Sequence, residues 1–336
     1  MLPKNNKTPT IYEVAELSGV SISTVSRVLN SPDKVNSETR ARVFKAIDKL
    51  AFVPKAEARA RALRQTGRIG VITPFFTAPS FVQRLRGIAG ALSKEHFELV
   101  VYTVKSLEQV KNYLSSLPIT GNLDGLIIMS LPVVEEDANR LLLHNLPVVL
   151  IEYPQPVLSS VEIDDMAGGR LSAEYLISKG HRRIAFLGDT DLPEYSIHPV
   201  SLRLMGFRQA LQEADILLPE EFIRLAPYTQ ERTRQAASEL ISMAEPPTAI
   251  FAATDFQALG VIKAARQLGV RVPEQLAVIG FDDLDMAEYL DLTTVRQHLD
   301  ESGRLAIEIL LAQIADPSRP VRHIQLPLTI IERATA

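Results

Sequence analysis

The sequence predicts a small all-helical N-terminal domain followed by a larger α/β body. Apolar residues in the first fifty positions recur at helical spacing in three short segments. From Ile69 onward, short apolar strands alternate with helical stretches, which is the pattern of parallel sheets. With 336 residues the chain is too long for one small core, so we expect separate domains.

Composition excludes several classes of protein. Hydrophobic residues make up 46% and charged residues 23% of the chain, as in ordinary globular proteins, and no apolar run is long enough to span a membrane. The polar N-terminus lacks a secretory signal, and the absence of cysteine excludes disulfides and cysteine-bound zinc. The six histidines lack metal-ligand spacing. We expect a cytoplasmic, nucleoid-associated protein that has no metal, no cofactor and no membrane partner.

Charge is distributed unevenly along the chain. Residues 1–66 contain twelve Lys or Arg and six Asp or Glu, a net charge of +6. Because the whole chain carries −4, the remainder carries −10. A basic head on an acidic body indicates a polyanionic partner at one end only.

Residues 10–30 predict two short helices around a tight turn. Thr10 and Glu13 form a capping box, which starts a helix by satisfying its first free N–H groups. Gly19 supplies the turn, and Ser21 is placed to cap the second helix. A third helix is expected to be capped by Asn36 or Ser37. The residues expected to face inward are Val14, Leu17, Val25, Val28, Leu29, Val43, Ile47 and Leu50.

This layout is typical of a helix-turn-helix, whose second helix enters the major groove of DNA. Arg27 is the best candidate for reading a base, because its guanidinium can pair bidentately with guanine; the alternative is a phosphate contact. Ile22 and Ser23 also point outward where base edges would lie. Short polar side chains suited to phosphate oxygens surround the same helix, namely Thr10, Ser21, Thr24, Ser26, Asn30 and Thr39.

The run Thr-Ile-Tyr-x-Val-Ala, followed by Gly-Val-Ser-x-x-Thr-Val-Ser-Arg-Val-Leu-Asn, resembles the N-terminal domain of the lactose/galactose repressor family of bacterial transcription regulators. The likeness extends across nearly the whole chain. It places Ile22, Ser23 and Arg27 on the family's base-contacting positions. It also implies a body of two lobes like that of type I periplasmic sugar-binding proteins.

The hinge is where this chain departs from the family. The family pattern Pro-Asn-x-x-Ala-Arg-x-Leu is a short helix that enters the minor groove, and here Lys55 replaces the Asn and Arg61 replaces the Leu. Ala58 keeps its family position. Two arrangements remain open: Leu63 acts as the wedge after a local shift, or Arg61 enters a narrowed A·T-rich groove. We favour Leu63.

The resemblance also divides the chain. It implies a DNA-binding domain at 8–53, a hinge and linker at 54–67, and an effector-binding and dimerisation domain at 68–333. The first lobe comprises 68–164 and 297–325, and the second comprises 165–296 and 326–333.

Helices are expected at Phe81–Glu95, a candidate for the dimer surface, and at Leu107–Leu117. Strands are expected at Ile69–Thr73, Leu99–Tyr102, Gly125–Met129, Val148–Ile151, Ile184–Leu187, Phe222–Leu225, Ala249–Ala252 and Ala277–Gly280.

Ligands of open α/β sheets collect beyond the carboxyl ends of the strands. Glu152, Asp255 and Asp282 follow strands in this way, although Asp282 also fits a strand-end turn and Asp255 a helix N-cap. A carboxylate and an arginine can clamp neighbouring sugar hydroxyls. By resemblance, Arg203 is the effector-binding arginine, and Thr254, Asp282 and Gln297 line the pocket. Phenylalanines after the first strand either cover a sugar ring or pack in the core: Phe75, Phe76 and Phe81.

Together these features predict a homodimeric, ligand-controlled transcription factor on a palindromic DNA operator. The preferred interpretation is a repressor of a carbohydrate uptake or utilisation operon, with a sugar as effector. Two alternatives are a regulator that responds to a purine or another metabolite, and a ligand sensor that does not bind an operator. An enzyme is disfavoured, because the carboxylates of Asp164-Asp165 and Asp282-Asp283 are adjacent in sequence and diverge at a strand end. We expect no catalytic residues.

Overall fold

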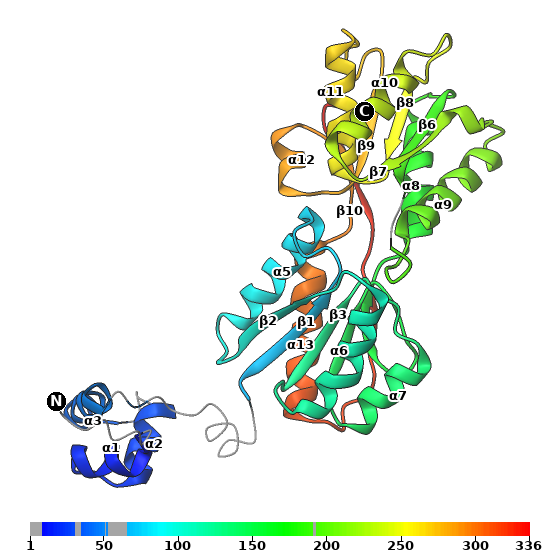
Figure 1. Cartoon of the computed structure of the whole chain (residues 1–336). Coiled ribbons are helices and arrows are strands. Elements are labelled where there is room, and N and C mark those ends of the chain that lie inside the picture. The colour runs from blue at the N-terminus through cyan, green and yellow to red at the C-terminus, as the bar shows by residue number, and fades with distance from the viewer. Residues whose placement is uncertain (1–8, 31–34, 51, 53–65, 191–192) are drawn as a thin grey trace. The chain divides into compact units, whose positions relative to one another are not determined.

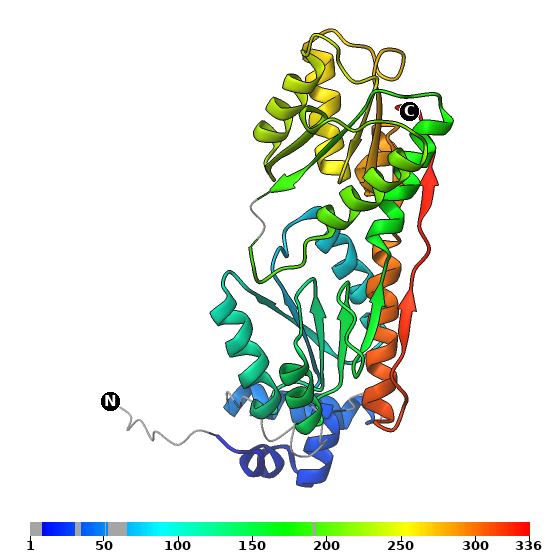
Figure 2. The same cartoon turned by 90° about the vertical axis from the view of Figure 1, so that its right-hand side faces the viewer.

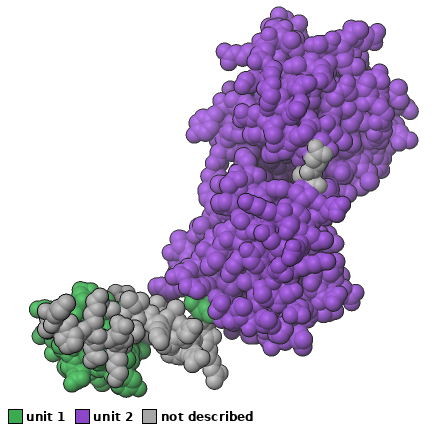
Figure 3. Space-filling view, viewed as in Figure 1, with its two compact units in different colours: residues 1–67 green, residues 68–336 purple. Residues whose placement is uncertain are grey.

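The computed structural model describes residues 9–30, 35–50, 52, 66–190 and 193–336. The chain separates into two compact units, residues 1–67 and residues 68–336 (Figure 3). The hinge residues Ala58, Arg61 and Leu63 lie outside the described residues, as does the side chain of Asn30. The choice between Leu63 and Arg61 as the minor-groove residue therefore stays a prediction.

The first unit contains the three expected helices, α1 (Ile11–Ser18), α2 (Ile22–Asn30) and α3 (Ser37–Leu50). The capping box is confirmed, because the Thr10 N–H donates to Glu13 Oε2 at 2.6 Å. Gly19 ends α1 in the left-handed region, with φ 65°. Of the two candidate caps for α3, Asn36 is the one used: its Oδ1 accepts the Thr39 N–H at 2.8 Å.

The core of this unit differs from the prediction at one position. Val14 is fully buried as expected, but the Leu17 side chain is 42% exposed. The buried stripe of α1 continues instead through Ala15 and Ser18, whose hydroxyl donates to the Val14 carbonyl at 2.6 Å. A buried serine bonded to its own helix therefore takes the place of the expected leucine. The other buried core residues are Val25, Val28, Val43 and Ala46.

The second unit is built on two six-stranded sheets (Figure 1). Lobe 1, as we name it, has a parallel sheet in the order β11-β5-β4-β3-β1-β2. Helices α5 and α13 pack in one apolar cluster with this sheet, and α6 and α7 in another. The elements are β1 (Arg68–Thr73), α5 (Pro79–Leu92), β2 (Glu98–Thr103), α6 (Leu107–Thr120), β3 (Gly125–Met129), α7 (Glu135–Leu143), β4 (Val148–Ile151), β5 (Ser159–Glu162), α13 (Leu299–Ala315) and β11 (His323–Gln325).

Lobe 2 has a sheet in the order β12-β10-β9-β8-β6-β7, parallel except for the antiparallel pair of β12 with β10. Its buried apolar residues form one continuous cluster. The elements are α8 (Asp165–Ser178), β6 (Ile184–Thr190), α9 (Pro199–Glu213), a 3-10 turn (Glu220–Phe222), β7 (Ile223–Pro227), α10 (Gln230–Ile241), β8 (Ala249–Ala252), α11 (Asp255–Gln267), β9 (Ala277–Asp282), α12 (Asp285–Tyr289), β10 (Thr293–Arg296) and β12 (Thr329–Ile331).

The chain passes from one lobe to the other between β5 and α8, between β10 and α13, and between β11 and β12 (Figure 2). The predicted α/β class is confirmed, and each predicted strand is present with its ends within three residues of the prediction. Strands β5, β10, β11 and β12 were not predicted. Helix α5 begins and ends earlier than expected. Among the described helices, none is both long and apolar enough to cross a membrane.

Two helix pairs in this unit pack with almost no space between their backbones. A Cβ on Gly206 of α9 would lie 1.9 Å from the Met166 carbonyl oxygen of α8. A Cβ on Gly87 of α5 would lie 1.9 Å from the Asp300 carbonyl oxygen of α13. In each lobe, the helix after the first strand therefore packs tightly against a helix that follows an interlobe crossing.

Candidate functional sites in the head and between the lobes

The exposed N-terminal half of α2 is the candidate DNA-binding face. Ser23 and Arg27 are exposed there, and the Ile22 side chain is 42% exposed although it is apolar. The Ser21 hydroxyl lies 2.8 Å from that of Ser23 and 2.9 Å from that of Thr24, and it caps the helix by accepting the Thr24 N–H. The three predicted base-contacting residues thus share one exposed face.

The predicted phosphate contacts are spread more widely over the head. Thr10 is exposed, and its hydroxyl donates to Glu13 Oε2 at 3.0 Å. Ser26 and Thr39 are half-buried. Helix α3 adds the cations Arg40, Arg42, Lys45 and Lys49 to the same unit. Ser21 and Thr24 are therefore best placed to meet an anion, because they lie at the N-terminus of α2, the end of a helix that favours negative charge.

In the second unit, a group of buried and half-buried polar side chains lies at the carboxyl ends of both sheets. We call it the interlobe cluster, and Figure 3 shows the surface hollowed between the two lobes. Its members come from strand ends, from the two inner helices and from the crossing segments. They are Arg84, Ser130, Glu152, Asp165, Asp189, Arg203, Asp282 and Gln297.

The lobe 1 part of the cluster centres on Arg84 in α5. Its guanidinium is buried and pairs with the Glu152 carboxylate, which also accepts the Ser130 hydroxyl. Arg84 Nη2 also donates to Gln297 Oε1 at 3.1 Å, and its Cζ lies 5.8 Å from the centre of the Phe81 ring. Phe81 therefore supports a buried cation from within the lobe 1 core.

The lobe 2 part of the cluster centres on Arg203 in α9. Its Nε donates to Asp165 Oδ1 at 2.8 Å and its Nη1 to the Ala253 carbonyl at 2.6 Å. The guanidinium carbon lies 3.6 Å from the centre of the Phe281 ring. Burial raises the pKa of Asp165, and the Arg203 charge opposes that shift. Arg203 is thus held firmly in place by three different elements.

Gln297 joins the two parts. It accepts from Arg84 of lobe 1 and donates to Asp282 Oδ1 of lobe 2. Burial raises the pKa of Asp282 to about 6, against the opposing charges of Arg203 and Arg84. Glu152 and Asp282, which end or follow β4 and β9, both have positive φ, 73° and 122°. Such backbone strain in non-glycine residues collects at functional sites.

The two arginines occupy equivalent places. Arg84-Leu-Arg-Gly87 in α5, the helix after the first strand of lobe 1, matches Arg203-Leu-Met-Gly206 in α9, the helix after the first strand of lobe 2. In both helices the arginine lies on a buried stripe, and the glycine three residues later meets a neighbouring helix. The sequence interpretation found Arg203 and missed Arg84. A charged residue on the apolar stripe of Phe81, Ile88 and Leu92 was the signal available for Arg84.

Sequence reasoning also missed residues at the ends of β6 and β7. Asp189 is in β6, and burial raises its pKa while Arg203 opposes the shift. Tyr228 follows β7 and stacks on Phe256 with ring centres 4.9 Å apart. Burial raises the pKa of the Tyr228 phenol, and a hydrogen bond with Thr254 lowers it. Thr254 also caps α11 by accepting the Gln257 N–H at 3.2 Å.

Several of the predicted effector-binding residues make contacts within the protein instead. Asp255 is fully buried: one carboxylate oxygen accepts the Leu284 N–H at 2.7 Å and the other accepts the Thr294 hydroxyl. The carboxylate therefore connects the start of α11 to β10 and to the segment after β9, and it exposes nothing to a ligand. Phe75 packs edge-on against Phe81 at 5.8 Å beside the lobe 1 core, and Phe76 is exposed.

Two of the carboxylates considered as acid–base pairs, Asp164 and Asp283, also accept hydrogen bonds from other groups of the protein. Asp164 caps α8 by accepting the Ala167 N–H at 2.8 Å. Asp283 accepts from Arg296 at 2.6 Å and from Arg333 at 2.8 Å. Within the described residues, no group of three or more His, Asp or Glu side chains could hold a metal ion.

The two lobes also make contacts outside the interlobe cluster. The Ile197 N–H donates to the Ser130 carbonyl at 3.2 Å, and Tyr195 packs against the lobe 1 core. Arg86 of α5 pairs bidentately with Asp285 of α12 at 2.6 and 3.0 Å, and its Nε donates to Asp300 at 2.9 Å. These contacts connect the two lobes in addition to the crossing segments and the interlobe cluster.

We expect Arg86→Ala to broaden the distribution of distances between the lobes. The pair is exposed, so its loss should change stability by less than about 1 kcal/mol while removing an interlobe tie. Spin labels on Lys111→Cys in α6 and Lys263→Cys in α11 would measure this, since the chain has no native cysteine. The matched control is Arg304→Ala, whose partners Glu301 and Glu308 lie on its own helix. Equal distributions in both variants would contradict the prediction.

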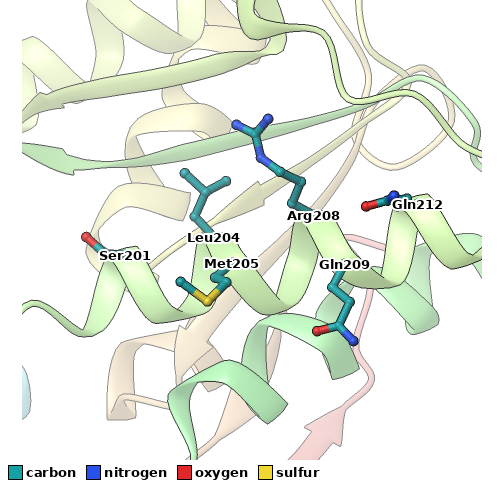
Figure 4. Close-up of a pocket in the computed structure, with 6 residues that line it drawn as sticks. All are labelled: Ser201, Leu204, Met205, Arg208, Gln209 and Gln212. Atoms are coloured by element: carbon teal, nitrogen blue, oxygen red, sulfur yellow. The ribbon is translucent and has the colours of Figure 1, made fainter.

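A separate hollow lies on the outer face of α9, away from the buried side of that helix that carries Arg203 (Figure 4). Its volume is about 430 Å³, and it is open to solvent. The residues that line it are Ser201, Leu204, Met205, Arg208, Gln209 and Gln212. Its polar groups come from one helix and do not converge, unlike those of the interlobe cluster.

A helix-turn-helix unit joined to a two-lobed body with a buried charged cluster defines a class of ligand-binding transcription regulators. Comparison with known proteins agrees. Residues 10–55 match the family model of bacterial regulatory proteins of the lacI family, and residues 173–336 match a periplasmic binding protein-like domain. The chain belongs to the lacI family of bacterial regulatory proteins.

Relatives match along nearly their whole length. The chain is 32% identical to the transcriptional repressor PurR of Vibrio vulnificus, with 97% of this chain and 98% of that protein covered. It is equally identical to the ribose operon repressor of Escherichia coli, with 97% and 99% covered. A structure of the lac repressor dimer bound to operator and the anti-inducer ONPF superposes with a TM-score of 0.78 at 29% identity, covering 98% of this chain and 99% of that one.

Proposed function

We propose that this protein is a ligand-responsive transcriptional repressor that binds a palindromic DNA operator as a homodimer and controls a carbohydrate uptake or utilisation operon. The observation that carries the proposal is the exposed face of α2, where Ile22, Ser23 and Arg27 lie together on a basic three-helix unit. One small head reads few base pairs, so two heads on an inverted repeat are needed for a specific site. The dimeric, operator-bound lac repressor structure supports this arrangement.

The ligand would act between the lobes. Arg84, Gln297 and Asp282 connect lobe 1 to lobe 2, so a ligand that replaces these contacts changes the lobes' relative rotation. That rotation would alter the spacing of the two hinges of a dimer and hence their order on DNA. A coupling of about 1–3 kcal/mol would change operator affinity several-fold to a hundredfold. Of the predicted effector residues, we retain Arg203, Asp282, Gln297, Glu152 and Thr254.

A sugar is the preferred effector, because the cluster is rich in charged groups that clamp hydroxyls. The ribose operon repressor among the relatives supports this choice. A purine is the alternative, since PurR is equally similar and Tyr228 with Phe256 offers an aromatic pair. Calorimetric titration with D-ribose and with hypoxanthine discriminates between the two classes.

We include three further points in this proposal. The chain divides into the DNA-binding domain at 8–53, the hinge at 54–67 and the two-lobed domain at 68–333. It acts by binding rather than by catalysis. As a regulator of transcription, it works in the cytoplasm at the nucleoid.

We expect Arg27→Lys to weaken binding to the specific operator by about 1–3 kcal/mol for each head, because lysine cannot pair bidentately with guanine. The operator is first obtained by selecting duplexes from a random library with the full-length protein. Affinities for the selected duplex and for a scrambled duplex are then measured at one salt concentration.

Arg27→Lys keeps its positive charge, so binding to the scrambled duplex should not change. An equal loss on both duplexes would assign Arg27 to a phosphate. Failure to select any symmetric duplex, with binding that does not respond to salt, would contradict the proposed function itself.

A further inference from the structure

Asp189 is a half-buried carboxylate with one oxygen, Oδ1, that is buried and has no hydrogen-bond partner among the described residues; its own backbone N–H is the hydrogen-bond donor that acts on the carboxylate. Its Oδ1 has no exposed surface and accepts no hydrogen bond from the described residues. It lies in β6, next in the sheet to β8 and β7, whose ends carry Thr254 and Tyr228. The charges that act on it are those of Arg203 and His198, and neither donates to it. An unsatisfied buried carboxylate oxygen costs free energy, so its presence needs an explanation.

A second unpartnered atom lies on the other side of the cluster. Arg84 Nε is buried without an acceptor, although Nη2 of the same side chain serves both Glu152 and Gln297. Among the described members of the interlobe cluster, each lobe therefore offers one buried unpartnered polar atom, a donor from lobe 1 and an acceptor from lobe 2. Protein groups already accept hydrogen bonds from Nη2 of Arg84 and from Nε and Nη1 of Arg203.

The charges of the interlobe cluster favour a neutral or cationic ligand over an anionic one. It contains four carboxylates, those of Glu152, Asp165, Asp189 and Asp282, against the guanidiniums of Arg84 and Arg203. Glu152 and Asp165 are each paired with an arginine. Asp189 and Asp282 are left without an ion pair within the cluster. An added negative charge would meet this excess of carboxylates in a place where water does not screen them.

We propose that Asp189 is a ligand-contacting residue, and that the effector carries a hydroxyl or ammonium donor at Asp189 and no negative charge. The effector would therefore be a neutral or amino sugar and not a uronic acid or a sugar phosphate. This inference rests on the proposed function, which it narrows. Before the ligand binds, Asp189 Oδ1 has no hydrogen-bond donor in the described part of the chain; when the ligand binds, its donor satisfies that oxygen.

The first experiment needs no ligand. In the full-length protein, Asp189→Asn should raise Tm by about 2 °C or more, because a neutral amide of the same size replaces a carboxylate with a buried oxygen that has no hydrogen-bond donor among the described residues. The matched control is Asp283→Asn, which removes the acceptor of Arg296 and Arg333 and should lower Tm. A fall in Tm for Asp189→Asn would show that the carboxylate has a structural partner, and would overturn the proposal.

The second experiment uses probes that share a ring and differ in one group: D-glucose, D-glucosamine and D-glucuronate, with D-ribose and D-ribose 5-phosphate as a second set. Each is titrated calorimetrically into the wild type and Asp189→Asn. Any probe that binds should be neutral or cationic, and should bind at least about tenfold more weakly to the variant. Binding of D-glucuronate or D-ribose 5-phosphate as tightly as its neutral counterpart overturns the proposal. So does equal affinity of both proteins for a neutral probe.

If no probe binds, the Tm comparison alone decides whether Asp189 is uncompensated. Operator selection separates this inference from the proposed function. A protein that selects a symmetric duplex and yet binds an acidic sugar keeps its function and loses the ligand class. A protein that fails to select a duplex but passes the Asp189 tests keeps the ligand site and loses the regulatory role.

Discussion

Arg203→Met is expected to lower the free energy of unfolding of the second unit by about 3–5 kcal/mol and to abolish stabilisation by any effector. The substitution leaves Asp165 as a buried carboxylate without its cation and the Ala253 carbonyl without its donor. Breaking a buried pair from one side has this cost because the remaining charge is uncompensated. Urea unfolding with and without the effector measures both effects.

Two further variants interpret the result. Arg203→Met with Asp165→Asn removes both charges and should recover part of the lost stability without recovering effector binding. Arg203→Lys keeps the charge but cannot reach Asp165 and Ala253 with the same planar geometry. A loss below about 1 kcal/mol in Arg203→Met would mean that the guanidinium is free for a ligand rather than built into lobe 2.

Gly206→Ala should destabilise the second unit by about 3 kcal/mol or more, because its new Cβ would lie 1.9 Å from the backbone oxygen of Met166. Backbone atoms cannot move aside as a flexible side chain can, so α8 and α9 must separate. Arg203 would then move away from Asp165, and effector affinity should fall together with stability. Thermal unfolding and calorimetric titration of the same preparation test this coupling.

Gly90→Ala is the matched control. Gly90 is also inside a helix of this unit, but a Cβ there meets nothing within 4 Å. Alanine should stabilise that helix by about 0.5–1 kcal/mol through its lower conformational entropy in the unfolded chain. Destabilisation of similar size in both variants would contradict the contact between α8 and α9 as the cause.

The head could be predicted closely, because its determinants are local. The capping box of Thr10 and Glu13, the turn at Gly19 and the cap at Ser21 all act within a few residues, and the structure has each of them. Leu17 was predicted to be buried because helical spacing alone does not show which neighbouring helix a side chain meets. Its place is taken by Ser18, a polar residue that its own helix satisfies.

The body was predictable where strands are apolar and buried on both faces, as β3, β4 and β8 are. Short edge or crossing strands such as β11 and β12 lack that pattern, since their residues are mostly exposed or half-buried. The interlobe cluster was harder still. Whether Asp255 or Asp189 is available to a ligand depends on which atoms of distant strands meet them, and spacing in the sequence does not contain that information.

The two buried arginines differ in which lobes hold their partners, so they respond differently when the lobes move apart. Asp165 begins α8 directly after a crossing, and it and Arg203 both belong to lobe 2, so the pair would travel as one rigid body when the lobes open. Arg84, Gln297 and Asp282 span both sides of the pivot, so any opening must break that chain. The environment of the Arg203 guanidinium should therefore stay the same when the lobes open, and that of the Arg84 guanidinium should change. Both can be measured in the same molecule, with Arg203 as the internal reference.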